Sequence, residues 1–193
     1  MSQANTVLSN LMFNLFVAKA PAEGKQAVLH RKGSNGNPDV PAEYIGSTRD
    51  EGIFKITGVK RVVEKEGSPI KGQSYYQITV VTKDADGKYH YYDGSLFVNG
   101  SKAAELAKPE SERAPKAANW PDLNGTLTLD RESGTALRMS AWAKTGQQAG
   151  KYLSVNCEPQ RPREDAAEDA SVPADAQHTP ATETEAAGGD LPF

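Results

Sequence analysis

The sequence predicts a mainly β protein, either a small barrel or a strongly curved antiparallel sheet, with one short helix and a disordered C-terminal tail. Three observations lead to this prediction. About eight short stretches of strand character recur along residues 1–157, and turns rich in Gly, Asn and Asp separate them. One short stretch has the start and stop signals of a helix. After residue 157 the composition changes abruptly, because large apolar residues become rare.

The first strands follow from local composition. An apolar stretch over 11–20 predicts a strand, and the Gly, Asn and Pro residues of 33–41 predict a long loop. Residues 53–65 are rich in β-branched side chains, and Gly58 within them predicts a β-bulge.

A hairpin follows this strand. Residues 74–83 alternate, so that Tyr76, Ile78 and Val80 share one face and Tyr75 lies on the other. The turn chemistry of Asp84-Ala85-Asp86-Gly87 then predicts a tight connection to a partner strand over 88–98.

A short helix is expected next, with Ser101 as its N-cap and its end before Pro109. Residues 109–124 form a connection rich in Pro and charged residues. Three more strands are predicted after it, with Gly-containing turns between them, over 126–130, 135–145 and 151–157.

Charge divides the chain into two parts. Residues 164–193 hold eight of the 25 acidic residues and none of the 22 basic ones, so residues 1–163 carry 17 acidic and 22 basic residues, a balance of +5. This split favours a nucleic-acid surface on the body. The tail from 158 is rich in Ala, Glu, Asp, Pro and Thr, and its burial could not offset the entropy of ordering it.

Several function classes lack their usual signals. Cys157 is the only cysteine and the three histidines have no ligand spacing, so we expect no metal site and no cofactor. No nucleophile motif or phosphate loop is present, and we therefore expect a protein that is not an enzyme. Residues 1–10 contain no basic residue and no apolar run is long enough to span a bilayer, which predicts a cytoplasmic protein without membrane contact.

The C-terminus carries the most specific motif. The chain ends in Gly189-Asp190-Leu191-Pro192-Phe193, and a Leu and a Phe at the end of a solvated tail have no core to join. This ending resembles that of bacterial single-stranded-DNA-binding proteins (SSBs), which have an acidic tail capped by Asp-Asp-Ile-Pro-Phe or a close variant. Gly189 is a departure, because a second Asp is usual there. The resemblance covers only the tail.

The resemblance implies a division of labour between the body, 1–157, and the tail, 158–193. The body would bind single-stranded DNA as an OB-like barrel or a PC4-like sheet. The tip, Asp190 to Phe193, would recruit an exonuclease, helicase, primosome or clamp-loader protein by placing the Phe ring in a pocket and its carboxylate beside a basic residue. It also implies a homo-oligomer. Residues 142–145 and 150–155 are loosely similar to small proteins of conjugative elements and plasmids, so a divergent SSB of a mobile element or phage is the expected type.

Single-stranded DNA binding requires aromatic faces for the bases and cations for the phosphates. Alternation in 135–145 and 151–157 places Trp142 and Tyr152 on the polar side of neighbouring strands. Nearby cations on these segments are Arg138, Lys144 and Lys151. The alternative for Trp142 is that it covers the edge of the sheet or lies in a subunit interface.

A second candidate set lies on the hairpin of 74–98. Tyr75 is expected to face outward, while alternation leaves open which of Tyr91 and Tyr92 does so. Three cations of the preceding strand, Lys55, Lys60 and Arg61, are candidates for phosphate contacts or form an ordinary solvated face. The alternative function is an adaptor protein that carries an SSB-like tail without binding DNA itself.

Overall fold

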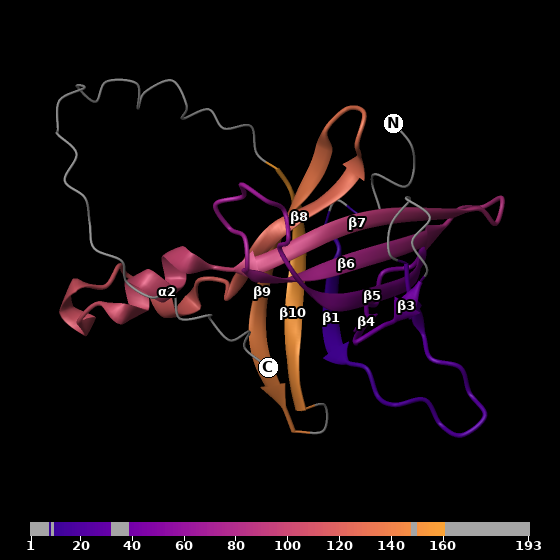
Figure 1. Cartoon of the computed structure of the whole chain (residues 1–193), viewed down its shortest axis with the longest axis horizontal. Coiled ribbons are helices and arrows are strands. Elements are labelled where there is room, and N and C mark those ends of the chain that lie inside the picture. The colour runs from indigo at the N-terminus through magenta and orange to yellow at the C-terminus, as the bar shows by residue number, and fades with distance from the viewer. Residues whose placement is uncertain (1–7, 9, 32–38, 148–149, 161–193) are drawn as a thin grey trace.

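The computed structural model describes residue 8 and residues 10–31, 39–147 and 150–160. One connection between two successive strands carries three helices, which lie outside the sheet (Figure 1). They are α2 (Gly100–Ala107) and the short 3-10 helices η1 (Glu110–Glu112) and η2 (Ala117–Asn119). The strands are β1 (Met12–Val17), β2 (Leu29–His30), β3 (Val40–Pro41), β4 (Tyr44–Ser47), β5 (Ile53–Val62), β6 (Ser74–Lys83), β7 (Tyr89–Val98), β8 (Leu123–Asp130), β9 (Thr135–Gly146) and β10 (Gly150–Pro159).

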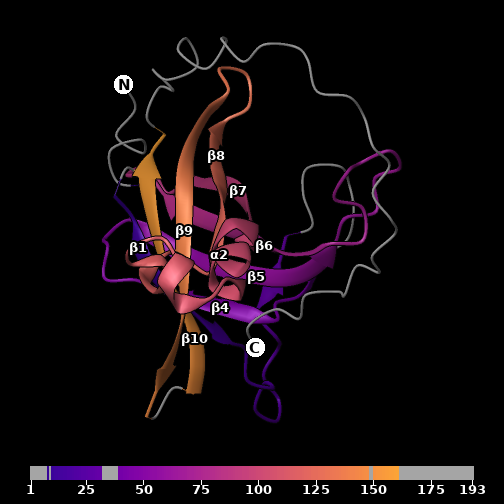
Figure 2. The same ribbon diagram turned by 90° about the vertical axis from the view of Figure 1, so that its left-hand side faces the viewer.

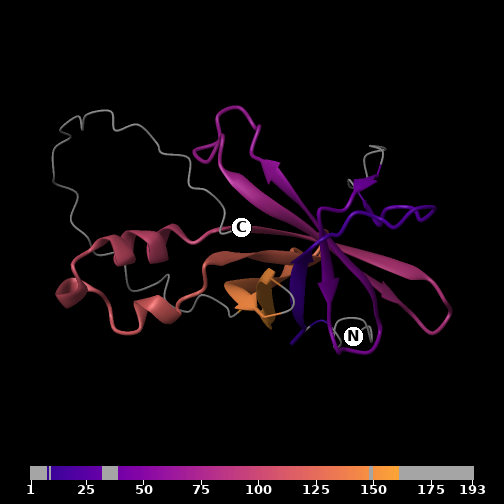
Figure 3. The ribbon, with the colours of Figure 1, turned by 90° about the horizontal axis from the view of Figure 1, so that it is seen from below.

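Eight of these strands close into an antiparallel barrel in the order β1-β10-β9-β8-β7-β6-β5-β4, and β4 pairs with β1 to complete the ring. From β4 to β10 each strand pairs with the next one along the chain. The sheet is strongly twisted, because β5, β6 and β7 run crosswise to β9 and β10 (Figures 1 and 3). The predicted mainly β fold is therefore confirmed as a closed barrel, consistent with an OB-like barrel, that carries the short helix α2.

Side chains that alternate along the strands fill the barrel interior. Tyr76, Ile78 and Val80 of β6 are buried, as predicted from their spacing. The buried residues of β9 and β10 follow the same rule: Leu137, Met139, Ala141, Leu153, Val155 and Cys157. An eight-stranded barrel is just wide enough for its own side chains to fill. The intervening polar residues therefore face outward, and the outer surface is where a ligand has room.

Glycine permits a close approach of two paired strands, β7 and β8. A Cβ atom on Gly125 of β8 would lie 1.7 Å from the backbone oxygen of Ser95 and 3.0 Å from the Cα of Leu96, both on β7. Any larger residue would push the two strands apart at this point.

The register corrects the position of the predicted bulge. Gly58 pairs regularly with Ile78 on one side and Tyr44 on the other, and the irregularity lies between Ile53 and Lys55, at Phe54. Packing explains the glycine instead, because a Cβ at position 58 would lie 3.1 Å from Cδ1 of Ile78.

The predicted N-cap of the helix was also wrong. Asn99 caps α2, and its side-chain oxygen accepts a hydrogen bond from the backbone N–H of Lys102 at 3.3 Å. Ser101 lies inside the helix. Asn99 also donates to the carbonyl oxygen of Pro121 at 2.8 Å, so it joins the start of the helix to the end of the same connection. The helix ends before Pro109, as expected.

The boundaries of the remaining predictions shift slightly. Val40 and Pro41, at the end of the predicted loop, form β3, which pairs with β2 in a separate two-stranded sheet. Strand β10 extends to Pro159, two residues beyond the expected end of the body. Most of the predicted tail, with its tip, lies outside the described residues. No helix in the described part of the chain is long and apolar enough to cross a membrane.

Candidate nucleic-acid interface

The register aligns seven outward-facing side chains in one line across the barrel. Each member lies opposite the next on the neighbouring strand, from β1 through β10, β9, β8, β7 and β6 to β5. We call this line the outer row: Met12, Asn156, Ser140, Asn124, Phe97, Tyr75 and Arg61. Adjacent strands are about 4.8 Å apart, so the six steps of the row span roughly 29 Å of curved surface.

Trp142 and Tyr152 lie beside one end of this row. Trp142 is opposite Ser154, and Tyr152 is opposite Lys144, so the two aromatic residues are diagonal neighbours on the outer face. Both are half-buried. Tyr152 also packs against Phe16 of β1, with ring centroids 5.3 Å apart. The predicted face of Trp142 and Tyr152 is thus the outer face of the barrel.

Two adjoining grooves are formed around these rings. One, of about 670 Å³, includes Trp142 in its lining, and the other, of about 720 Å³, includes Tyr152 and Arg49. Met12, Lys144 and Ser154 line both grooves. A chain of nucleotides that followed the grooves would therefore pass Lys144 between the two rings.

The two aspartates in these grooves are already engaged by the protein. Asp50 accepts hydrogen bonds from the hydroxyl of Thr48 at 3.0 Å and the backbone N–H of Met12 at 3.3 Å. Asp122 pairs with Lys102 at 2.7 Å. By contrast, neither Lys144 nor Arg49 forms an ion pair within the described ranges. The cations are therefore the charges that remain available to a ligand.

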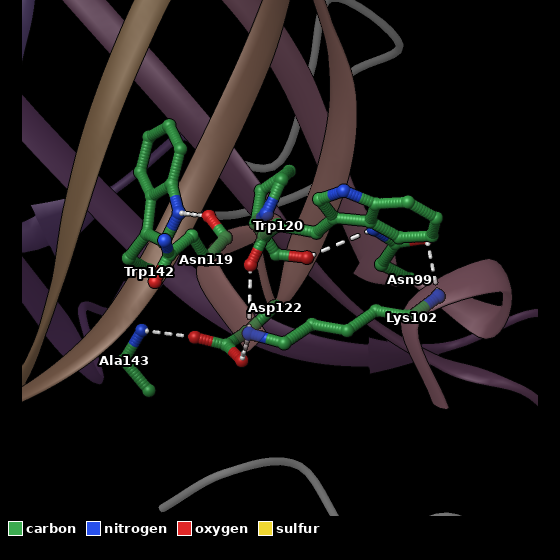
Figure 4. A network of polar contacts seen from close by, with 8 residues as sticks. Asn99, Lys102, Asn119, Trp120, Asp122, Trp142 and Ala143 are labelled. Atoms are coloured by element: carbon green, nitrogen blue, oxygen red, sulfur yellow. Dashed lines mark hydrogen bonds and ion pairs between the residues drawn. The ribbon is translucent and has the colours of Figure 1, made fainter. Parts of the chain in front are cut away.

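A network of polar contacts fixes the position of Trp142 (Figure 4). Its indole N–H donates to the carbonyl oxygen of Asn119 in η2 at 3.0 Å. Next to it, Asp122 accepts a hydrogen bond from the backbone N–H of Ala143 at 2.8 Å. Lys102 of α2 donates to the carbonyl oxygen of Trp120 at 2.7 Å. The connection that carries α2 thus lies against β9, and Figure 2 looks onto this side of the barrel.

These contacts leave an aromatic face of Trp142 for a ligand. The hydrogen bond to Asn119 uses the edge of the indole, and the ring still contributes to the lining of a groove. The edge of Trp142 is thus bound to the connection between β7 and β8, and a subunit interface remains the alternative role for its face. A ring held at its edge is a rigid platform, which reduces the entropy lost on binding.

The other end of the outer row holds a second ring pair. Tyr75 and Phe97 stack with their centroids 5.0 Å apart and an interplanar angle of 19°. They line a third groove, of about 630 Å³, together with Lys65. Arg61 is opposite Tyr75, and its Nη2 atom is buried without a hydrogen-bond partner among the described residues.

The structure separates some predicted cations from the rings. Lys60 pairs with the buried Tyr76, so it faces away from Arg61 and Lys55. Lys151 likewise lies on the face of β10 opposite to that of Tyr152. Arg138 is exposed on the outer face but lies opposite Glu158. Lys55 donates to the carbonyl oxygen of Leu29 at 3.0 Å. Of the nine predicted DNA-binding residues, Trp142, Tyr152 and Lys144 form one cluster and Tyr75 and Arg61 another.

Sequence reasoning missed two rings of the site, Phe16 and Phe97. Alternation alone assigns both to the outer face, but their pairing with Tyr152 and Tyr75 depends on strand register. Of Tyr91 and Tyr92, which alternation alone could not assign to a face, Tyr91 is the one that faces outward: it is 46% exposed and Tyr92 only 8%.

Within the described part of the chain, no group of three or more His, Cys, Asp or Glu side chains is arranged to hold a metal ion. Comparisons with protein-family models, curated proteins and solved structures gave no match.

Proposed function

We propose that this protein binds single-stranded DNA without sequence preference on the outer face of its barrel. The observation that carries the proposal is the cluster of Trp142, Tyr152 and Lys144, in which the two rings line adjoining grooves. Lys144 lines both grooves and forms no ion pair among the described residues. Bases stack on aromatic faces whatever their identity, and cations along the path neutralise phosphates.

The outer row extends this proposal across the barrel. Between the two aromatic ends, the row offers Asn156, Ser140 and Asn124, whose small polar side chains leave room for a strand and hydrogen-bond its sugars or base edges. Tyr75 and Phe97 then provide a second stacking position. A strand that is already unpaired has bases available for both positions, whereas a duplex does not.

The C-terminal tip gives the proposed protein its second role. We propose that Asp190, Leu191, Pro192 and Phe193 recruit replication, recombination or repair proteins such as exonucleases, helicases, primosome or clamp-loader components. The support is the motif itself, since these residues lie outside the described structure. A divergent, self-associating SSB of a mobile element or phage, without enzymatic activity and located in the cytoplasm, is the protein type that fits both parts.

A binding titration tests the proposal directly. Fluorescence anisotropy of labelled single-stranded and duplex oligonucleotides should show much tighter binding to the single strand. The slope of log K against log salt should be about −0.7 per phosphate neutralised. Equal affinity for both forms at every salt concentration would indicate only a generic basic surface. The absence of oligonucleotide binding under all conditions would favour the adaptor alternative, in which the tail alone is functional.

A further inference from the structure

The bulge in β5 turns a large aromatic side chain into solvent. In a regular strand Phe54 would face the barrel interior, because its neighbour Lys55 pairs on the outer face with Val81. The register irregularity between Ile53 and Lys55 removes Phe54 from this alternation, and the ring is 57% exposed. Bulges commonly re-aim a side chain next to a functional site. Exposing a Phe that could be buried costs free energy, and a ligand that covers the ring would recover it.

Phe54 belongs to a group of exposed rings. Its centroid lies 4.8 Å from that of Tyr89 on β7, across the intervening strand β6. Tyr89 is 39% exposed, and Tyr91, two residues further along the same face of β7, is 46% exposed. We call Phe54, Tyr89 and Tyr91 the aromatic platform.

Cations accompany these rings. The guanidinium carbon of Arg31 lies 4.2 Å from the centroid of Tyr91, and Nζ of Lys83 lies 5.4 Å from that of Tyr89. The nearby carboxylate of Asp84 forms a hydrogen bond with Nε2 of His90 at 2.9 Å. Because cations lie over two of the exposed rings, the platform complements a ligand with both phosphates and bases. A second copy of the same surface fits poorly, since a symmetric contact would bring these cations against each other.

The platform is separate from the outer row. Tyr91 and Phe97 are six residues apart on β7, a distance of roughly 20 Å along an extended strand. Between these ends, His30 of β2 is fully buried against β5, with its Nδ1 atom 3.0 Å from the hydroxyl of Thr57. The small β2–β3 sheet thus covers part of the outer face between the two aromatic regions.

We infer that the aromatic platform is a second single-stranded-DNA contact on the same protomer, which a strand reaches only after it has filled the outer row. This inference rests on the proposed function. It requires that long oligonucleotides gain affinity from the platform and that short ones do not. The protein would accordingly protect a longer piece of DNA than the outer row alone can cover.

The experiment compares oligothymidylates of about 8 and about 30 nucleotides, the shorter being within the range of one site. Binding is measured by anisotropy for the wild type, for the double variant Phe54→Ala/Tyr91→Ala and for the ring-free but apolar variant Phe54→Leu/Tyr91→Leu. The exposed Val17→Ala, which lies outside the platform and lines none of the three grooves, is the control for general surface effects. Thermal midpoints and light scattering on each variant check the fold and the oligomeric state.

Both double variants should lose roughly 5- to 100-fold in affinity for the long oligonucleotide and change less than about twofold for the short one. Unchanged long-oligonucleotide binding would overturn the inference and leave the proposed function intact. So would a Leu variant with wild-type affinity, which indicates apolar contact without stacking, or a variant that loses DNA binding only because its oligomer dissociates. A wild type that binds neither oligonucleotide would overturn the proposed function itself, and this inference with it.

Discussion

At the scale of single residues, the outer face combines rings held in place with a cation, Lys144, that has no ion-pair partner among the described residues. Trp142 is bound at its edge to Asn119, and Tyr152 packs against Phe16. Lys144, opposite Tyr152, forms no ion pair in the described ranges. Such fixed rings lose little conformational freedom when a base stacks on them.

Replacement of Trp142 or Tyr152 by Ala should therefore weaken single-stranded-DNA binding more than it weakens folding. Stacking contributes about 1–3 kcal/mol per base, which corresponds to roughly a 5- to 150-fold loss in affinity. Removal of a fully buried aromatic residue would instead lower stability by about 3–5 kcal/mol. Anisotropy titrations and thermal midpoints of the same samples separate the two effects.

The matched controls keep a ring at each position. Trp142→Phe loses the hydrogen bond to Asn119 and part of the ring area, and Tyr152→Phe loses only the hydroxyl, so both should retain more affinity than the Ala variants. An Ala variant that melts early and yet, when folded, binds DNA normally would contradict the proposed site. Quenching of Trp fluorescence by bound DNA in the wild type, and its reduction in Trp142→Phe, is the spectroscopic check.

His30 predicts a loss of stability on mild acidification. Burial, followed by the nearby charge of Arg61, lowers the pKa of His30 below its usual value of 6.5, although Asp93 opposes the shift. Above pH 6.5 both folded and unfolded states hold the neutral ring. As the pH falls below 6.5, the unfolded chain takes up the proton first, so the folded state loses stability.

The measurement is the thermal midpoint between about pH 7.5 and 5.5 for the wild type and for His30→Asn. The variant retains a donor near Thr57 but has no group that titrates in this range. It should start from a lower midpoint and fall less steeply with pH. Parallel slopes for the two proteins would show that His30 is not responsible.

At the scale of secondary structure, predictions succeeded where the signal is local. Alternation identified β6, β9 and β10 and the faces of Tyr76, Trp142 and Tyr152, because a side chain's face depends only on its own strand. Predictions failed where a contact with a second, distant element determines the local structure. Asn99 caps α2 in preference to Ser101 because Asn99 also bonds to Pro121, 22 residues away. The pairing of Phe97 with Tyr75, and of Arg31 with Tyr91, depends on barrel closure in the same way.

The close approach of the paired strands β7 and β8 at Gly125 predicts that Gly125→Ala is strongly destabilising. The new Cβ would lie 1.7 Å from the backbone oxygen of Ser95, and backbone atoms cannot move away as a flexible side chain can. We expect a loss of at least about 3 kcal/mol, the upper end of the usual range for overpacking. Chemical denaturation of the variant measures this loss.

Gly100→Ala is the control for this substitution. A Cβ on Gly100 meets no atom within 4 Å, and the residue begins α2, so the change should be neutral or slightly stabilising. Equal stability of Gly125→Ala and Gly100→Ala would mean that β7 and β8 do not approach each other as closely as described.

At the scale of the whole molecule, opposite charges are placed in one chain. Residues 1–163 carry a balance of +5, and the eight acidic residues of 164–193 bring the total to −3. In the proposed function, the tail and the DNA phosphates would therefore be attracted to, and compete for, the same basic body. Because these attractions are screened beyond about 8–10 Å at physiological ionic strength, their competition should depend on salt.

Two truncations separate the roles of the tail and its tip. Removal of residues 190–193 deletes only the aspartate nearest the end and the recognition residues, so DNA affinity should stay unchanged or rise slightly while binding to a tail-recognising exonuclease or helicase is lost. Removal of 164–193 deletes all eight acidic residues and should raise DNA affinity at low salt, with the gain shrinking as salt increases. Anisotropy titrations at several salt concentrations measure both effects on one oligonucleotide. If the 190–193 deletion abolished DNA binding and spared the partner, the tip and not the barrel would contact DNA, and the proposed division of labour would be reversed.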